Sequence, residues 1–216
     1  MNSTMTLSPL RLVSACATAA LMAGCASPEP TLHTLTVRPQ ATDSGRFQRA
    51  FRLSGVRVPD RLDKPQIVLR TSDDEVLALE QQRWASPFGS ELRDALSADL
   101  AGTLSAVEVG GNAAPAGVPL YRISTDMRSY DARPGQAVTA LVSWRVTRDA
   151  AMQGANPAAL TCQTMLAQPA GGDAQASAGV DTVVASTQRM VQQWSQQIAQ
   201  SVQALEGLAA TPAWCR

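Results

Sequence analysis

The sequence predicts a single α/β domain in which a mixed, mostly antiparallel sheet is combined with two helices. Several segments alternate apolar and polar residues, the period of a half-buried strand, and two longer segments repeat apolar residues with helical spacing. The chain length fits one domain with a hydrophobic core. Aromatic residues make up only 4% of the chain, so we expect a core of Val, Leu, Ile and Ala.

Residues 1–24 are predicted to form a lipoprotein signal peptide. Arg11 precedes an apolar, alanine-rich run that is too short to cross a bilayer permanently, and small residues then precede Cys25. We expect cleavage before Cys25, acylation of its thiol with chains such as palmitate, a short tether over residues 25–31 and a periplasmic domain over residues 32–216. Each buried CH₂ of the acyl chains contributes about 0.8 kcal/mol to the anchor. The alternative is a cytosolic cysteine that follows small residues by chance.

Ala26 determines the expected membrane. In bacteria with two membranes, Asp directly after the lipidated cysteine commonly retains a lipoprotein at the inner membrane. Ala26 therefore favours the outer membrane, with the domain on its periplasmic face. A bacterium with a single membrane would give the protein a different location.

Charge and cysteine content narrow the possible partners. The chain has 18 basic and 18 acidic residues, and loss of Arg11 with the signal peptide leaves a slight acidic excess, which argues against nucleic-acid binding. Cys16 leaves with the signal peptide, so Cys162 and Cys215 remain to form a disulfide in an oxidising periplasm. In the chain-entropy model this disulfide contributes about 4 kcal/mol and fixes the C-terminus to the domain. A metal site is the alternative, but His33 lies too far away in the sequence to complete a ligand set.

The stretch from Gly55 to Trp84 is predicted to form a rigid docking edge. A strand over residues 51–58 ends in a turn at Pro59, a second strand opens at Pro65, and the two prolines are expected to fix the register between these strands. Residues 67–69 and 76–79 form a hairpin, followed by a polar loop to Trp84. The candidate docking residues are Arg57, Pro59, Leu62, Asp63, Pro65, Gln66, Arg70 and Trp84. A charged, solvated hairpin without a partner is the alternative.

The other strands and helices are predicted from the alternating and the helical spacing of apolar residues. A first strand is expected over residues 32–37. Ser86 is predicted to be the N-cap of a helix that begins at Pro87. Leucines at four-residue intervals up to Leu104 face the sheet, whereas Glu91 lies on the polar side. Short strands are expected over residues 106–109 and 160–166, a hairpin over residues 120–127 and 138–147, and a long C-terminal helix over residues 180–205.

We expect no catalytic residue, no metal site and no cofactor. The sequence contains no Gly-x-Ser-x-Gly, Walker, dinucleotide-binding, His-Glu-x-x-His or Cys-x-x-Cys motif. His33 is the single histidine, and its place beside the tether is poor for a catalytic triad. The acidic residues 73–75 lack the spacing of a calcium loop and are expected to form a solvated turn.

The order of these features resembles the ABC-type transport auxiliary lipoproteins of the PqiC/YmbA type. The resemblance rests on Cys25, Leu32–Leu35, the run from Val56 to Arg70, Trp84 and the two helices, and it covers nearly the whole mature chain. His33 departs from the pattern, since a tyrosine is usual there, and the cysteine pair is not general to the family.

The resemblance implies a fold similar to the N-terminal domain of TolB and a non-catalytic, outer-membrane lipoprotein. It also implies that the protein docks an MCE-type lipid transport system, made of an MCE-domain protein and its membrane permease or ABC transporter, and that it forms a homo-oligomer. The alternative function is a free-standing lipid-binding or envelope-assembly lipoprotein.

Overall fold

The structure, a computed structural model, describes residues 28–35, 47–149, 158–171 and 177–216. The segment Thr31–Arg216 forms one compact unit. The predicted signal peptide, Cys25 and the expected end of the first strand lie outside the described residues. None of the helices in the described part is both long and apolar enough to cross a membrane.

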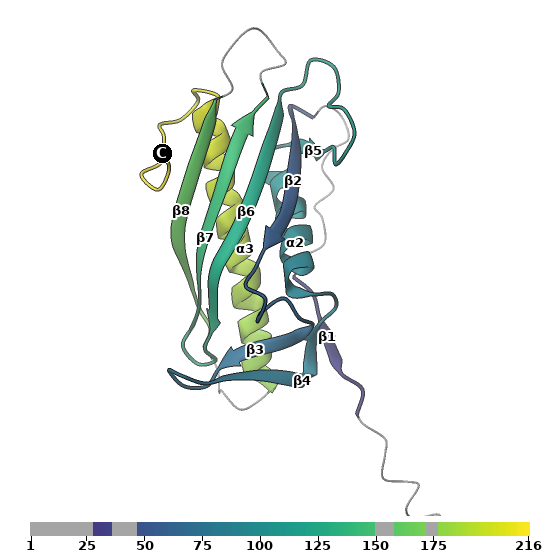
Figure 1. Ribbon diagram of the computed structural model, residues 1–216, viewed down its shortest axis with the longest axis vertical. Helices are drawn as coiled ribbons and strands as arrows, with labels where there is room; N and C mark the ends of the chain where they lie inside the picture. The colour runs from purple at the N-terminus through teal and green to yellow at the C-terminus, as the bar shows by residue number, and fades with distance from the viewer. Residues whose placement is uncertain (1–27, 36–46, 150–157, 172–176) are drawn as a thin grey trace, which may run out of the picture. The chain divides into compact units, whose positions relative to one another are not determined.

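Eight strands and two labelled helices form this unit (Figure 1). A three-stranded sheet has the order β1-β4-β3, and a five-stranded sheet has the order β5-β2-β6-β7-β8. The elements are β1 (Thr31–His33), β2 (Arg49–Arg57), β3 (Gln66–Arg70), β4 (Val76–Trp84), α2 (Phe88–Thr103), β5 (Ala106–Glu108), β6 (Leu120–Ala132), β7 (Ala137–Arg148), β8 (Ala159–Pro169) and α3 (Ser177–Leu205). The predicted α/β class and the long C-terminal helix are confirmed, but the strands divide into two sheets rather than one.

The antiparallel strands β6, β7 and β8 confirm the predicted hairpin and the strand beside it. The turn between β6 and β7 is closed by a hydrogen bond from Arg133 N to Ala137 O of 3.0 Å. Gly135 occupies a left-handed conformation in this turn, with φ of 77°, which explains why glycine suits that position. β2 joins the hairpin in parallel, and β5 pairs in parallel with β2.

Both helices pack on one face of the five-stranded sheet and lie behind it in Figure 1. Leu92, Leu96 and Leu100 of α2 are fully buried, as the leucine spacing predicts, and Trp194 of α3 is also fully buried. Because β6 and β7 alternate buried and more exposed side chains, their polar residues point to the opposite face. No helix among the described residues packs on that face, and its side chains Arg122, Ser124 and Arg128 are exposed.

The small sheet corrects two expectations about residues 55–84. β2 and β3 lie in different sheets, so Pro59 and Pro65 do not set a register between paired strands. The turn between them is closed by a hydrogen bond from Leu62 N to Pro59 O of 2.8 Å, and Leu62 is buried, which directs the chain from one sheet to the other. The expected polar loop before Trp84 is instead part of β4. This strand is central in its sheet, so its main chain forms hydrogen bonds with β1 on one side and β3 on the other. Its polar side chains remain partly or fully exposed.

The start of α2 also differs from the prediction. Pro87, not Ser86, is the N-cap, and it makes no side-chain capping bond. Ser86 instead donates to the carboxylate of Glu91, from its hydroxyl at 2.8 Å and its amide at 3.1 Å. Glu91 also accepts hydrogen bonds from Thr34 Oγ1 (2.8 Å) and Leu35 N (2.9 Å), and it is buried rather than on the polar side. This carboxylate therefore joins the N-terminal segment to α2.

Candidate functional site

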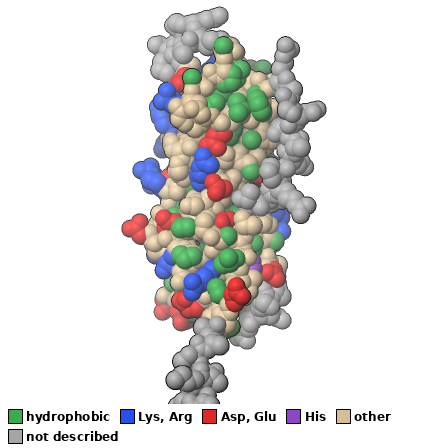
Figure 2. Space-filling model, turned by 90° about the vertical axis from the view of Figure 1, so that its right-hand side faces the viewer, with side chains coloured by type: hydrophobic (Ala, Val, Ile, Leu, Met, Phe, Trp, Pro, Cys, Tyr) green, Lys and Arg blue, Asp and Glu red, His purple; other side chains and the backbone are tan. Residues whose placement is uncertain are grey.

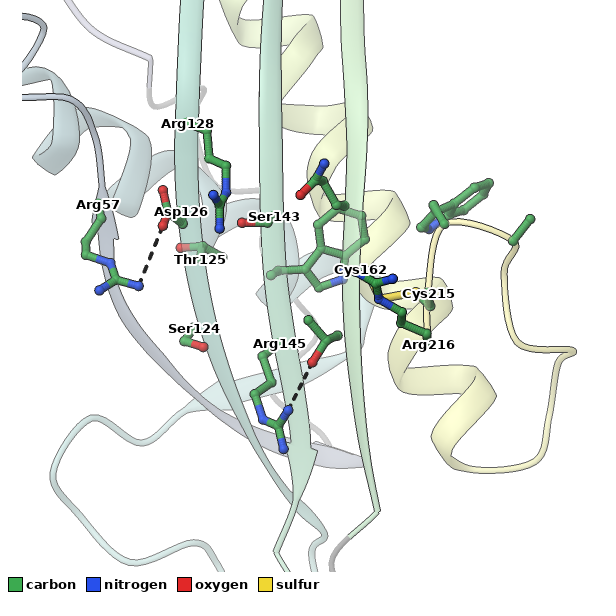
Figure 3. A pocket seen from close by; sticks show the side chains of 15 residues that line it. Arg57, Ser124, Thr125, Asp126, Arg128, Ser143, Arg145, Cys162, Cys215 and Arg216 are labelled. Atoms are coloured by element: carbon green, nitrogen blue, oxygen red, sulfur yellow. Dashed lines mark hydrogen bonds and ion pairs between the residues drawn. A yellow bond between two sulfur atoms is a disulfide. The ribbon is translucent and has the colours of Figure 1, made fainter.

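The open face of the five-stranded sheet carries a groove with a volume of about 650 Å³ (Figure 3). Strand register builds it, because residues paired across neighbouring strands point to the same face. One row of pairs runs from Arg57 through Asp126 and Ser143 to Gln163, and the adjacent row contains Ser124, Arg145 and Thr161. We call this feature the open-face groove; its floor is polar.

Arginine side chains exceed acidic ones in the open-face groove. Arg57 is 82% exposed, and its Nη2 lies 3.6 Å from Asp126 Oδ2. Arg145 donates to Thr161 Oγ1 at 3.0 Å, and Arg128 makes no side-chain hydrogen bond or ion pair within the described residues. In Figure 3, Arg57 and Arg128 lie on either side of Asp126. These three guanidinium groups face a single acidic side chain, that of Asp126.

The C-terminal segment forms one wall of the groove. Thr161 and Arg216 exchange two main-chain hydrogen bonds, of 2.8 and 2.9 Å, and Gln163 N donates to Trp214 O at 3.0 Å. The predicted disulfide between Cys162 and Cys215 is present. Arg216 also lines the groove and adds a fourth guanidinium group to it.

The eight candidate docking residues do not form one edge. Arg57 lies in the open-face groove, whereas Leu62 and Trp84 are buried at 5% and 3% exposure. Trp84 stacks on Phe88 with ring centroids 5.3 Å apart, so its side chain belongs to the core. The sequence could not show this, because its partner Phe88 belongs to a different element.

The other candidate docking residues lie on or near the turn between the sheets. Asp63 Oδ1 accepts a hydrogen bond from Gly89 N at 3.1 Å, which satisfies a free amide at the start of α2. Gln66 contacts Glu80 at 3.5 Å. Pro59 and Pro65 supply carbonyl groups to main-chain hydrogen bonds. Of this group, Pro65 and Asp63 are exposed.

Arg70 belongs to a charged cluster at the junction of the two sheets. Its guanidinium group pairs with Asp131, which also accepts from Arg133 Nε at 3.0 Å, and Arg133 contacts Asp73 at 3.1 Å. Burial acts to raise the pKa of Asp131, but the two guanidinium groups outweigh burial and hold this pKa below its ordinary value. The cluster therefore contains an ionised carboxylate that ties β3 to the end of β6.

The described residues contain no group of three side chains that could hold a metal ion. On the side of the molecule shown in Figure 2, basic and acidic side chains are interspersed. The arginine excess in the open-face groove differs from this mixed surface.

The fold and the site define an α/β domain with one helix-covered and one open sheet face. The chain belongs to the family described as the ABC-type transport auxiliary lipoprotein component, whose model matches residues 31–199. This match agrees with the resemblance in the sequence. None of the curated proteins matches the chain significantly.

Two solved structures share the fold. One, a crystal structure of an uncharacterized protein, is 20% identical, with a TM-score of 0.59, and the match covers 81% of this chain and 99% of that one. The other is a DUF330 family protein from Xanthomonas campestris. It is 16% identical, with a TM-score of 0.54, and the match covers 82% of this chain and 97% of that one.

Proposed function

We propose that this chain is a periplasmic lipoprotein, anchored in the outer membrane through acylated Cys25, that docks an MCE-type lipid transport system. Its partners are the MCE-domain protein and, through it, the membrane permease or ABC transporter. The observation that carries the proposal is the family match over residues 31–199. The apolar run and small residues before Cys25 support the anchor.

The open-face groove is the docking surface in this proposal. An exposed antiparallel face offers side chains at fixed spacings without disturbing the core. The arginine excess suits an acidic surface on the MCE-domain protein, since complementary charge speeds association and selects partners. Arg57 connects this surface to the docking stretch expected from the sequence, and the exposed residues Asp63 and Pro65 lie further along the same chain segment.

The anchor is tested by expression of the full chain in a bacterium with two membranes. Metabolic labelling with palmitate is expected to label the chain, and Cys25→Ser is expected to abolish the label and release the domain from outer-membrane fractions. Inner-membrane fractionation of the labelled chain would contradict the proposed location.

Docking is tested by co-purification of the full chain with the MCE-domain protein of the same organism. The proposal predicts a complex that weakens as salt concentration rises, because the contact includes exposed charges. Failure of the two proteins to associate at low salt, with both folded, would contradict the docking role.

A further inference from the structure

A second cavity, of about 230 Å³, lies between the small sheet, the turn after β2 and the end of β6. Its apolar walls come from Leu62 of the turn, Val68 of β3, Val76 and Ala78 of β4, and Tyr130 and Ala132 of β6. We call it the junction cavity. A dry apolar cavity of about 150 Å³ is large enough for benzene, so the junction cavity has room for part of an alkyl chain.

The side chains of Tyr130 and Asp131, on the walls of the junction cavity, already have polar partners. Tyr130 Oη shares a hydrogen bond of 2.8 Å with Thr187 Oγ1. Asp131 forms ion pairs with Arg70 and Arg133. A polar ligand would therefore find few free groups on these walls, whereas an apolar chain loses nothing by contacting them.

Two cations at the rim have no such partners. Arg61 and Lys64 line the cavity, and within the described residues their side chains form no hydrogen bond or ion pair. The neighbouring acidic residues do not neutralise these two cations at the cavity rim. Asp60 and Asp63 do not line the cavity, and Asp63 accepts a hydrogen bond from Gly89 N. An apolar cavity with unbalanced cations at its rim is complementary to a ligand with an apolar body and an anionic end.

We propose that the junction cavity binds a single-chain anionic amphiphile, an alkyl carboxylate or alkyl phosphate. The alkyl chain lies against Val68 and Ala78, and the anionic group lies at Arg61 and Lys64. Each methylene that enters the cavity raises affinity roughly fourfold, the equivalent of its transfer free energy. The inference rests on the proposed role in lipid transport and deepens it, because it gives this chain a lipid site separate from the open-face groove.

The test uses the full-length acylated chain in phosphatidylcholine nanodiscs and a twelve-carbon alkyl phosphate that carries a photoreactive diazirine on its chain. Mass spectrometry is expected to locate the crosslinks on β3 and β4. Ala78→Phe fills the cavity and is expected to lower this labelling at least tenfold. The matched control is Ala167→Phe on the exposed side of β8, which should leave the labelling unchanged.

The charge requirement is tested with Arg61→Gln combined with Lys64→Gln, both at positions near the surface where folding is not at risk. This variant should lose labelling by the alkyl phosphate and keep any weak labelling by the matching uncharged alkyl alcohol. Equal labelling of wild type by the two probes, or labelling that Ala78→Phe leaves intact in a folded protein, would overturn the proposal. Full displacement of the alkyl phosphate by an equal concentration of inorganic phosphate would also overturn it, because the alkyl chain would then add nothing to affinity.

These results are separable from the docking proposal. If the chain binds the MCE-domain protein but is not labelled in the junction cavity, only this inference fails. If labelling occurs without association between the two proteins, the docking role fails and the cavity stands.

Discussion

The two sheets are held in the molecule in different ways. The five-stranded sheet is packed under two helices, and a disulfide fixes the C-terminal segment to its edge strand. The three-stranded sheet also buries apolar residues, but carboxylates make its links to the rest of the domain: Glu91 at the N-terminal segment and Asp131 at β3. We infer that the open-face groove is preformed. The junction cavity, in contrast, lies beside ion pairs of Asp131 whose strength depends on pH.

Removal of the disulfide is expected to have the largest effect and to fall on the large sheet. Cys162→Ala with Cys215→Ala should lower the free energy of unfolding by about 4 kcal/mol, because the cysteines are separated by 53 residues and the unfolded chain gains that freedom. Denaturant unfolding followed by circular dichroism measures the change. Reductant should destabilise the wild type in the same way and leave the double variant unchanged; an equal response of both proteins would show that the disulfide contributes nothing.

Replacement of Glu91 tests the link between the N-terminal segment and α2. Glu91→Ala removes the acceptor of four hydrogen bonds in a buried place, so we expect a loss of roughly 2–3 kcal/mol in unfolding free energy. Asp94→Ala is the matched control on the same helix, at an exposed position, and should cost less than about 0.5 kcal/mol. Equal losses of unfolding free energy in the two variants would mean that Glu91 does not join the N-terminal segment to α2.

Acid is expected to loosen the small sheet. The folded-state pKa of Asp131 is lowered, so the stability it contributes is full above the ordinary value of 3.8 and is lost as pH falls through the lower folded value. Amide hydrogen exchange in β3 and β4 should therefore accelerate as pH falls below about 4, after correction for intrinsic exchange. Asp131→Asn should remove this dependence.

Glu206 provides the comparison within the large sheet. Burial acts to raise its pKa, but Arg49, with two bonds of 2.8 Å, and Tyr121 Oη at 2.7 Å hold the pKa below its ordinary value. The stability that Glu206 contributes is therefore also lost as pH falls through its lowered pKa. Glu206→Gln should change amide hydrogen exchange in β2 and β6 rather than in β3. If Asp131→Asn alters both sheets equally, the two regions are not separate.

The smallest effect on stability is expected at Arg57. Its contact with Asp126 is exposed and spans 3.6 Å, so Arg57→Gln should change the unfolding free energy by less than about 0.5 kcal/mol. A larger loss would show that the open-face groove holds the fold together and is not simply a surface. Thermal unfolding of the two proteins provides the measurement.

Local sequence patterns predicted the elements whose partners are close in the chain. The β6–β7 hairpin follows from alternation on each side of a glycine turn, and α3 follows from its apolar spacing. The disulfide followed from the small number of cysteines that remain once Cys16 and Cys25 are assigned to the predicted signal peptide and lipid anchor. The hairpin and the helix depend on few distant contacts, whereas the disulfide joins residues 53 positions apart and was predicted by elimination of the other cysteines.

The features that the sequence did not predict depend on distant partners. Glu91 lies at a position that an isolated helix would expose, and it is buried because Thr34 and Leu35, more than fifty residues earlier, donate to it. The extension of β4 to Trp84 depends on pairing with β1. The open-face groove was partly visible as arginines on the polar sides of neighbouring strands, at Arg128 and Arg145, but Arg57 joins them only through the parallel pairing of β2 with β6.

The most direct test of the docking claim is the affinity of the MCE-domain protein for the full chain with Arg57→Glu and Arg145→Glu, measured by biolayer interferometry beside the wild type and Ala78→Phe. We expect the charge reversal to weaken binding at least tenfold, and the Ala78→Phe variant, changed in the junction cavity, to bind like the wild type. Wild-type affinity in the folded charge-reversal variant would contradict docking through the open-face groove.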